Sequence, residues 1–371
     1  MISLVVPTCN ERANLEPMLR RSAAALSIAA AAFEIIIVDD ASTDGTRDEV
    51  RRLQAGGFPW LRLIERDHEH DLSTAVLAGW RAARGDVLGC MDADLQHPPE
   101  LLSALVLALR RQAADVAIAS RYTPGASLGA WGKARRLGSR AATALASLIL
   151  PGALAGVTDP MSGFFLVSRR AAALEALRPQ GYKILLELLA RAQPLQVTEV
   201  PFRFGTRTAG ESKASWRVTW RFLRQIAALA AATGELRRMV NFGLVGLSGT
   251  AVNYAGFALL RHLTPSVAID AAASAAIAIC NNFLGNEFYT FRDAARLAPA
   301  WRDRAARFAR FYALSLAGLG INTAVVLALT GLLAWPLALA AGITSAVSWN
   351  FFSNSTLTWR RTPQTARARA A

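Results

Sequence analysis

Four long apolar segments occupy most of the last third of the chain, at residues 240–260, 267–291, 308–329 and 337–359. Each is long enough to cross the ~30 Å hydrocarbon core of a bilayer as a helix. Apolar residues make up 53% of the 371-residue chain and charged residues only 18%, which argues against a disordered chain and a wholly soluble protein. The sequence therefore predicts an all-α domain of four membrane-spanning helices over residues 239–360.

The positive charge is concentrated in this apolar part of the chain. Residues 217–371 contain 16 Lys and Arg against 5 Asp and Glu, whereas residues 1–216 contain 25 against 22. Basic residues that flank apolar segments favour the anionic inner leaflet of a membrane over nucleic acid. We therefore expect the membrane surface, and no nucleic acid, among the partners.

The arginines between and after the apolar segments are distributed unevenly. The loop between the second and third segments and the C-terminal tail contain Arg292, Arg296, Arg302, Arg304, Arg307, Arg360, Arg361, Arg367 and Arg369. The other two connections contain only Arg261. The positive-inside rule then predicts a multi-pass protein of the cytoplasmic membrane, with both termini and the basic tail (361–371) in the cytoplasm. Residues 1–7 lack the basic start of a signal peptide, so none is expected.

The apolar part also contains an internal repeat. Asn282, Phe283, Asn286 and Thr290 recur 68 residues later as Asn350, Phe351, Asn354 and Thr358. This spacing predicts a duplicated two-helix hairpin. Asparagines inside membrane helices are costly unless they face a partner, so we favour helix–helix contacts over a lipid or sugar pathway. Such contacts could also join two copies of the chain.

Residues 1–215 alternate short apolar runs with helical patterns. The apolar runs lie at 1–7, 35–38, 61–64, 87–91 and 116–119, and the helical patterns lie at 13–32, 46–54, 73–83 and 100–111. This alternation is typical of an α/β domain with a parallel sheet and helices on both faces. Ligands of such sheets bind beyond the carboxyl ends of the strands. The functional residues should therefore directly follow the apolar runs.

Two further segments have the character of membrane-surface helices. Residues 216–238 alternate Trp, Phe and Leu with Arg, as expected of an amphipathic interfacial helix that links the two domains. Residues 141–157 are apolar but too short and too broken by Pro and Gly to span a bilayer. They fit an interfacial segment or an ordinary core helix equally well.

The strongest local signal is MDADLQHPPE at residues 91–100. Asp92 and Asp94 follow a buried strand and, two residues apart, point to the same side of an extended segment. Two carboxylates beside a phosphate favour a hard cation such as Mg²⁺ or Mn²⁺. A DxD pattern alone could also be an acidic turn in solvent. The position of this motif directly after a buried strand argues against that interpretation.

Other strand ends also carry polar residues. Asp39 and Asp40 follow the second apolar run, and Arg121 follows the fifth. Arg135 and Ser139 are four residues apart and therefore share one helix face, which could hold a phosphate or lie on anionic lipid. A polar turn at Asp159 and a cationic, Gly-containing segment at 207–213 complete the candidate site.

These motifs together resemble glycosyltransferase family 2, and more narrowly the polyprenyl- or dolichol-phosphate mannose synthases. The resemblance covers about residues 1–215 and rests on VVPTCNE (5–11), VDDASTDGT (38–46), MDADLQHPPE (91–100), ASRY (119–122), DPMSGFF (159–165), GYKILLELL (181–189), VPFRF (200–204) and GESK (210–213). Residues 238–360 resemble the GtrA-like four-span module. The resemblance implies a GT-A (Rossmann-like) domain and an inverting, metal-dependent transfer of sugar.

The resemblance also implies roles for residues at the matching positions. The nucleoside would be held by Pro7, Cys9, Glu11, Val38, Asp39 and Asp40. The donor would contact Asp92 and Ala93, the metal would bind Asp94 and Gln96, and the phosphates would contact Arg121, Arg207 and Lys213. The lipid phosphate would be received by Arg135 and Ser139. Two residues depart from the family pattern, because Cys9 replaces a common aromatic and Asp71 replaces an expected glycine.

The expected reaction is transfer of mannose from GDP-mannose to polyprenyl monophosphate. The second pKa of such a phosphate is ~6, so it needs aiming and charge neutralisation rather than deprotonation. UDP-glucose or another nucleotide sugar is an alternative donor. A family 2 transferase that acts on a glycan or glycolipid hydroxyl is a second alternative and would need a carboxylate base, for which Asp159 is the candidate. A lipid-linked sugar flippase is less favoured, because only Asp270 and Glu287 are acidic within the spans.

Overall fold

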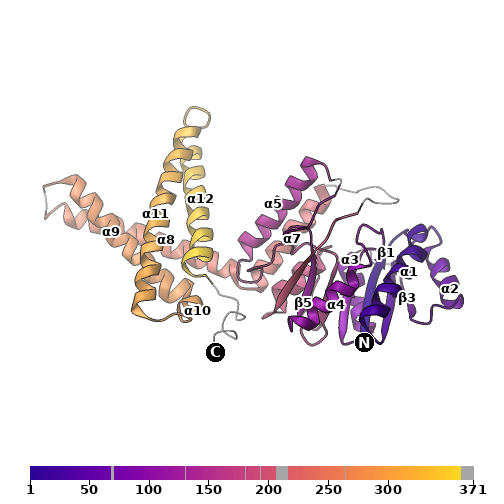
Figure 1. The fold of residues 1–371 in the computed structure, drawn as a ribbon. Helices are drawn as coiled ribbons and strands as arrows, with labels where there is room; N and C mark the ends of the chain where they lie inside the picture. Colours follow the sequence, from indigo (N-terminus) through magenta and orange to yellow (C-terminus); the bar gives the residue numbers. More distant parts are fainter. Residues whose placement is uncertain are drawn as a thin grey trace. The chain divides into compact units, whose positions relative to one another are not determined.

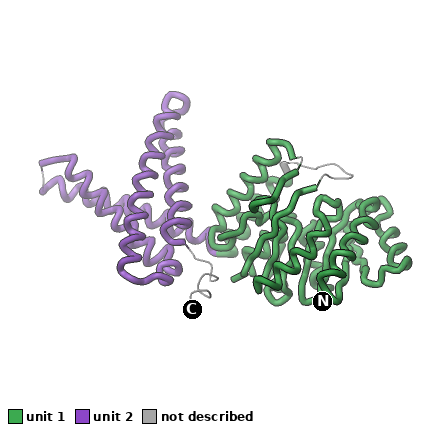
Figure 2. Tube along the Cα trace, viewed as in Figure 1, with its two compact units in different colours: residues 1–233, 364–371 green, residues 234–363 purple. Residues whose placement is uncertain are grey.

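The computed structural model describes residues 1–67, 71–129, 131–179, 181–192, 194–205, 216–263 and 265–360. The chain forms two compact units, of which the first comprises Met1–Thr233 and the second begins at Gly234 (Figure 2).

A single mixed sheet forms the centre of the first unit (Figure 1). Within the described residues it has seven strands, in the order β3-β2-β1-β4-β6-β5-β7. They are β1 (Ile2–Thr8), β2 (Phe33–Asp40), β3 (Leu61–Arg66), β4 (Val87–Cys90), β5 (Val116–Ser120), β6 (Phe165–Ser168) and β7 (Val197–Pro201). The helices are α1 (Arg12–Ala29), α2 (Thr46–Ala55), α3 (Leu72–Ala82), α4 (Leu101–Arg111), α5 (Lys133–Ile149), α6 (Ile184–Arg191) and α7 (Trp216–Ala232).

The prediction of an all-parallel sheet is wrong at β6. Strands β1, β2, β3 and β4 pair in parallel, as do β5 and β7, but β6 is antiparallel to both β4 and β5. A four-residue apolar run is too short to be recognised by periodicity, and the direction of a strand leaves no mark in its own sequence. As a result β5 is separated from β4 by β6.

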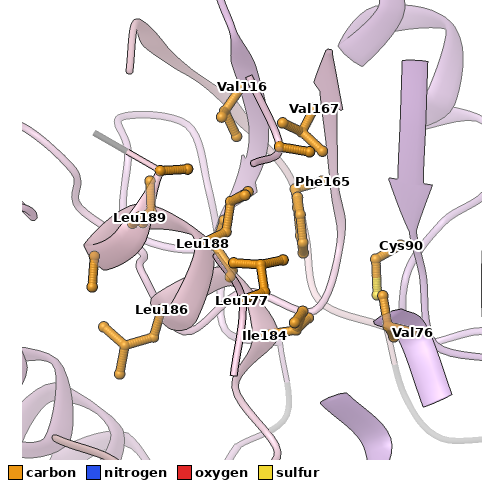
Figure 3. Close-up of a cluster of buried hydrophobic side chains, with 14 of the residues drawn as sticks. Val76, Cys90, Val116, Phe165, Val167, Leu177, Ile184, Leu186, Leu188 and Leu189 are labelled. Carbon is orange, nitrogen blue, oxygen red and sulfur yellow. The ribbon is translucent and has the colours of Figure 1, made fainter. Parts of the chain in front are cut away.

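The strands are buried on both faces and contribute alternate side chains to two cores. Leu4 and Ile37 pack with α1 and α4 on one face, whereas Val5 and Val38 pack with α3 on the other. The second face also buries residues of α6 and α7, and Figure 3 shows Leu177 and Leu188 near Phe165, and Cys90 next to Val76. Helices on both faces leave the carboxyl edge of the strands open for ligands.

The apolar stretch at 141–157 is divided between the end of α5 and a following non-helical segment. Its first part belongs to α5, of which only Ala146 is buried. From Leu150 the chain leaves the helix, because Pro151 and the glycines nearby disfavour its continuation. Leu150 and Leu154 then join the core.

The predicted linker helix at 216–238 is two helices rather than one. Helix α7 ends at Ala232, and α8 begins at Glu235 after Gly234, whose φ of 78° favours glycine. Phe222, Ile226 and Leu229 of α7 are buried in the core of the first unit, whereas Trp220 is 61% exposed. The amphipathic face of α7 is therefore used to pack against protein.

The second unit consists of helices. They are α8 (Glu235–Leu260), α9 (Val267–Gly285), the π-helical turn η1 (Asn286–Thr290), α10 (Arg292–Ala295), α11 (Trp301–Leu329), α12 (Trp335–Ser353) and the π-helical turn η2 (Asn354–Thr358). Among the described residues, three segments are long and apolar enough to cross a membrane, namely Glu235–Leu260, Val267–Thr290 and Trp301–Leu329. The fourth predicted span, 337–359, coincides with α12 and the turn η2.

The structure repeats the pattern that is visible in the sequence of this unit. The two π-helical turns lie 68 residues apart, and Asn286 Nδ2 and Asn354 Nδ2 each donate to the carbonyl oxygen four residues earlier, at 2.8 Å. The equivalent rings of Phe291 and Trp359 stack on one another with their centroids 4.7 Å apart. The two hairpins are thus copies that meet through equivalent residues.

Candidate active site

Three residues in left-handed backbone conformations mark the carboxyl edge of the sheet. Asn10 (φ 62°) and Ala41 (φ 53°) follow β1 and β2, and Leu95 (φ 60°) lies in the DxD loop after β4. This conformation is uncommon for residues other than glycine and persists only where the surroundings enforce it. The three loops at this edge are therefore held in defined, turned conformations.

Hydrogen bonds between side chains and backbone join the first two loops. Ser42 Oγ accepts from the Asn10 amide at 2.8 Å, and Asn10 Oδ1 accepts from the Thr43 amide at 2.8 Å. Asp44 accepts from the Arg12 amide at 3.1 Å and from the amide of Thr46, the first residue of α2. Asp44 thus connects the start of α1 to the start of α2.

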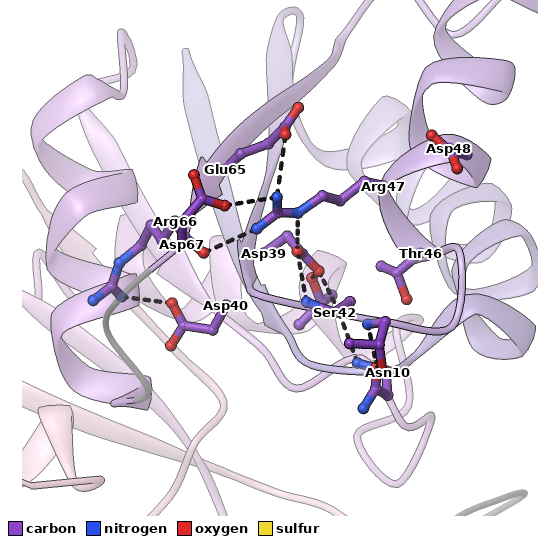
Figure 4. Close-up of polar contacts among 12 residues, drawn as sticks. Asn10, Asp39, Asp40, Ser42, Thr46, Arg47, Asp48, Glu65, Arg66 and Asp67 are labelled. Atoms are coloured by element: carbon purple, nitrogen blue, oxygen red, sulfur yellow. Dashed lines mark hydrogen bonds and ion pairs between the residues drawn. The ribbon is translucent and has the colours of Figure 1, made fainter.

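Asp39 and Asp40, both predicted to hold the nucleoside, differ in their surroundings (Figure 4). Asp39 is fully buried, and its oxygens accept from Thr8 at 3.3 Å, from Ser42 and from Arg47 Nε at 2.6 Å. Asp40 is 7% exposed and pairs with Arg66 at 3.1 Å. The carboxylate of Asp39 is therefore already engaged by protein donors.

The other predicted nucleoside residues lie at the end of β1 and in β2. Cys9 is exposed, whereas Pro7 and Glu11 are partly buried, and Glu11 accepts from Asn14 Nδ2 at 2.7 Å. The side chain of Val38 is fully buried in the core, so only its backbone can face a ligand.

The DxD loop contains residues of differing exposure. The side chain of Asp92 is 37% exposed, whereas Asp94 and Gln96 are 5% and 9% exposed and Ala93 is buried. Asp94 Oδ1 accepts from the Gln96 amide at 3.1 Å, and Gln96 O accepts from the Gly205 amide at 2.9 Å. Gly163 lies so close that an added Cβ would be 3.1 Å from the Asp92 carboxylate.

Asp94 and Gln96 fit a magnesium or manganese ion. They provide a carboxylate and an amide oxygen next to a second carboxylate, Asp92, and such hard oxygen donors suit these cations. The described residues contain no group of three or more His, Cys, Asp or Glu that could hold a metal. Mg²⁺ usually keeps several waters and binds substrate phosphates, so one or two protein carboxylates are enough to hold it.

His97 belongs to this site, although it was not among the predicted site residues. Its Nδ1 accepts from the Asp92 amide at 3.2 Å, and its ring stacks on Phe164 and contacts Phe202 and Phe204 edge-on. Burial lowers the pKa of His97 to about 4, so the ring is neutral at physiological pH. A neutral acceptor in an aromatic cage holds the backbone at Asp92 in place.

Arg121 and Asp159 form a bidentate pair. Arg121 Nε and Nη2 each donate to one oxygen of Asp159 at 2.7 Å, and the Arg121 amide donates to Asp159 at 3.0 Å. Asp159 is fully buried. Because both of its oxygens serve Arg121, Asp159 is poorly suited to act as a general base.

The predicted lipid-phosphate residues lie next to Arg121. The guanidinium groups of Arg121 and Arg135 lie 5.4 Å and 4.1 Å from the centroid of the Trp131 ring. Ser139 Oγ accepts from Tyr122 Oη at 2.8 Å. The structure therefore brings Arg121, Arg135 and Ser139 together around Trp131 and Tyr122, two residues that were not predicted.

Lys183 is a further cation of this site. Its Nζ donates to the Met161 carbonyl oxygen at 3.2 Å and lies 4.9 Å from the centroid of the Tyr182 ring. Burial, with Arg121 acting in the same direction, lowers the pKa of Lys183 to about 8. A lysine in a motif gives no sign of its burial, so only the structure reveals it.

Arg207 and Lys213 lie outside the described residues. Asp71, one of the two departures from the family pattern, caps helix α3 by accepting from the amides of Ser73 and Thr74 at 2.9 and 3.4 Å. Where the family pattern has glycine, this chain therefore has a residue whose side chain caps the helix.

Two family descriptions match the chain. "Glycosyl transferase family 2" matches residues 3–173, and "GtrA/DPMS, transmembrane domain" matches residues 241–359. These matches confirm the predicted order of an α/β domain followed by an apolar helical domain.

Three similar proteins span different shares of the chain. The dolichol-phosphate mannosyltransferase of Pyrococcus furiosus is 36% identical over 359 residues, which are 96% of this chain and 99% of that protein. The dolichol-phosphate mannosyltransferase of Saccharomyces cerevisiae is 41% identical over 61% of this chain and 86% of its own length. The undecaprenyl-phosphate mannosyltransferase of Micrococcus luteus is 34% identical over 57% of this chain and 86% of its own length.

Proposed function

The chain belongs to glycosyl transferase family 2 and carries a GtrA/DPMS transmembrane domain, and on this premise we propose that it transfers mannose from GDP-mannose to a polyprenyl monophosphate. The product is polyprenyl-phosphate-mannose, formed with inversion at the anomeric carbon. The choice of mannose rests on the names of the three relatives, one of which covers nearly the whole chain.

The observation that carries the choice of acceptor is the bidentate Arg121–Asp159 pair. Both carboxylate oxygens of Asp159, the candidate base for a hydroxyl acceptor, accept hydrogen bonds from Arg121. A phosphate monoester, with a second pKa of ~6, is mostly ionised at neutral pH and needs no base. The site instead offers cations near Ser139 that can orient such an anion and offset its charge.

We assign the remaining roles from the resemblance to the family. Pro7, Cys9, Glu11, Asp39, Asp40 and the backbone of Val38 surround the nucleoside. Asp92 and Ala93 face the donor sugar and diphosphate, to which Arg121, Arg207 and Lys213 add positive charge. Arg135 and Ser139 receive the lipid phosphate. Because the nucleophilic oxygen attacks from the face opposite the leaving nucleotide, these two groups of residues must hold the substrates in line.

Asp94 and Gln96 would hold Mg²⁺ or Mn²⁺. When bound, such an ion supplies the positive charge that stabilises a departing diphosphate. The protein contributes the turn at Leu95, which keeps the backbone of Asp94 and Gln96 in fixed positions. His97 supports the same loop through the Asp92 amide.

The membrane arrangement is proposed on the arginine distribution. The catalytic domain (1–215), the loop before α11 and the tail (361–371) would lie in the cytoplasm, with four spans over 239–360 and acceptor taken from the inner leaflet. Contacts between the membrane domains of two copies stay a prediction.

The proposed function is tested by donor choice in membranes that contain the full-length protein. Labelled GDP-mannose and UDP-glucose are each supplied with polyprenyl phosphate and Mn²⁺. We expect chloroform-soluble, acid-labile label from GDP-mannose, and its loss in Asp94→Ala and Arg135→Ala. Label from UDP-glucose alone would reassign the donor, and no lipid product from either donor would overturn the proposal.

A further inference from the structure

We propose that the ammonium group of Lys183 binds the phosphate of the lipid acceptor, a role that nothing in the family motifs assigns to it. This inference rests on the proposed function and adds a third cation to Arg121 and Arg135 at the acceptor end of the site. Lys183 lies directly before helix α6.

The backbone and side chain of Lys183 are fixed by different parts of the fold. Its carbonyl oxygen accepts from Gln225 Nε2 of α7 at 3.0 Å, and Gln225 is 1% exposed. Its ammonium donates to the carbonyl oxygen of Met161 at 3.2 Å. Met161 lies in the turn that contains Asp159, so the ammonium is held beside the Arg121–Asp159 pair.

The carboxylates near Lys183 attract its ammonium group without forming an ion pair with it. Arg121, Arg135, Asp92 and Asp159 are the charged groups that act on it most strongly. Asp159 is engaged by Arg121, and among the described residues no carboxylate lies within ion-pair distance of the ammonium. A partly buried cation that forms no direct ion pair favours an anionic ligand.

The hydrogen-bonding capacity of Lys183 agrees with this. An ammonium group has three donors, and the described residues accept one of them. The side chain is only partly buried, so a ligand can reach it. A phosphate oxygen is an acceptor that would satisfy both the charge and a remaining donor.

The packing favours the acceptor phosphate over the donor diphosphate. Lys183 precedes α6, and α6 and α5, which carries Arg135 and Ser139, both pack against α7. Ser139 Oγ accepts from Tyr122, so its own proton remains available to a phosphate. Lys183, Arg135 and Ser139 thus belong to one group of packed helices, whereas Asp94 and Gln96 follow β4.

The test compares Lys183→Met and Lys183→Gln with Lys183→Arg in the full-length protein in detergent. Lys133→Met, which changes an exposed lysine of α5, is the matched control. Binding of a short-chain isoprenyl monophosphate and of GDP is measured, together with KM for polyprenyl phosphate and the unfolding temperature. Glutamine retains a donor for Met161, so it distinguishes loss of charge from loss of this structural contact.

We expect Lys183→Met and Lys183→Gln to weaken monophosphate binding and raise the acceptor KM about ten- to a hundredfold. Affinity for GDP and the unfolding temperature should stay near the wild-type values, and Lys183→Arg should recover most of the acceptor binding. Unchanged monophosphate binding would overturn the inference. Loss of GDP affinity alone would assign the ammonium to the donor and overturn it as well. A wild-type protein that neither binds the monophosphate nor forms lipid product would instead overturn the proposed function.

Discussion

Arg121 holds Asp159 through two parallel hydrogen bonds of 2.7 Å, and the carboxylate is completely buried. This geometry makes Asp159 a positioning residue for Arg121 and removes it from the set of available bases. It also fixes the guanidinium group near Trp131 and Arg135, at the end of the site that we assign to the lipid phosphate.

Asp159→Asn should therefore lower stability together with activity. Removing one charge of a buried pair leaves the other uncompensated, at a cost of about 3 kcal/mol in unfolding free energy. Thermal unfolding of the full-length protein measures this, with Asp48→Asn as a control because the side chain of Asp48 is 82% exposed. A variant with wild-type unfolding and no transfer would point to a base instead.

Asp94→Asn should abolish most of the metal-dependent transfer. Loss of the carboxylate weakens binding of the cation, and we expect kcat/KM to fall about 100-fold or more at fixed Mn²⁺. Binding of Mn²⁺ in the presence of GDP gives a readout that does not depend on turnover. Asp86→Asn, at a side chain that is 88% exposed, should bind Mn²⁺ as the wild type does. Equal Mn²⁺ affinity in Asp94→Asn and wild type would show that the ion binds elsewhere.

The pH dependence of acceptor use should reflect Lys183. Its pKa is lowered to about 8, so the ammonium loses its charge, and with it the attraction for phosphate, as pH rises through that value. The acceptor gains its second negative charge above about pH 6. The kcat/KM for acceptor should therefore be highest between about pH 6 and 8. The Lys183→Arg variant stays charged, so its kcat/KM for acceptor should fall only at a higher pH than that of the wild type. If the fall occurs at the same pH in both proteins, it does not arise from Lys183.

The contact between Gly249 and Asn282 should be essential to the first membrane hairpin. A Cβ at Gly249 would overlap Asn282 Oδ1, whereas a Cβ at Gly246, one turn earlier in α8, would meet nothing within 4 Å. Gly249→Leu should thus lower the unfolding temperature of the detergent-solubilised protein, and Gly246→Leu should not. Equal effects of the two substitutions would mean that helix propensity, not this contact, determines the outcome.

The sequence was sufficient for the order of elements and for the residues at strand ends. Buried apolar runs and helical periods located β1 to β5 and α1 to α4, because these elements follow local rules. It was insufficient for β6, whose direction depends on its neighbours, and for α7, whose apolar face packs against protein although its composition also suits a membrane surface.

The same distinction separates the parts of the site. Asp92, Asp94 and Arg121 were predicted because they follow strands. His97 and Lys183 were not, because a histidine in an aromatic cage and a desolvated lysine are defined by residues distant in sequence, such as Phe202 and Met161. The bidentate pair of Arg121 and Asp159 is likewise a tertiary contact, which no local sequence pattern predicts.

The most direct test of the account asks whether the acceptor is a phosphate. Full-length protein with GDP-mannose and Mn²⁺ is given polyprenyl phosphate or polyprenol of the same chain length, and the lipid product is examined by ³¹P NMR. We predict a product only from the phosphate, with a single phosphodiester signal and inverted anomeric configuration. Mannosylation of the polyprenol, or a product that retains a phosphate monoester signal, would contradict the account.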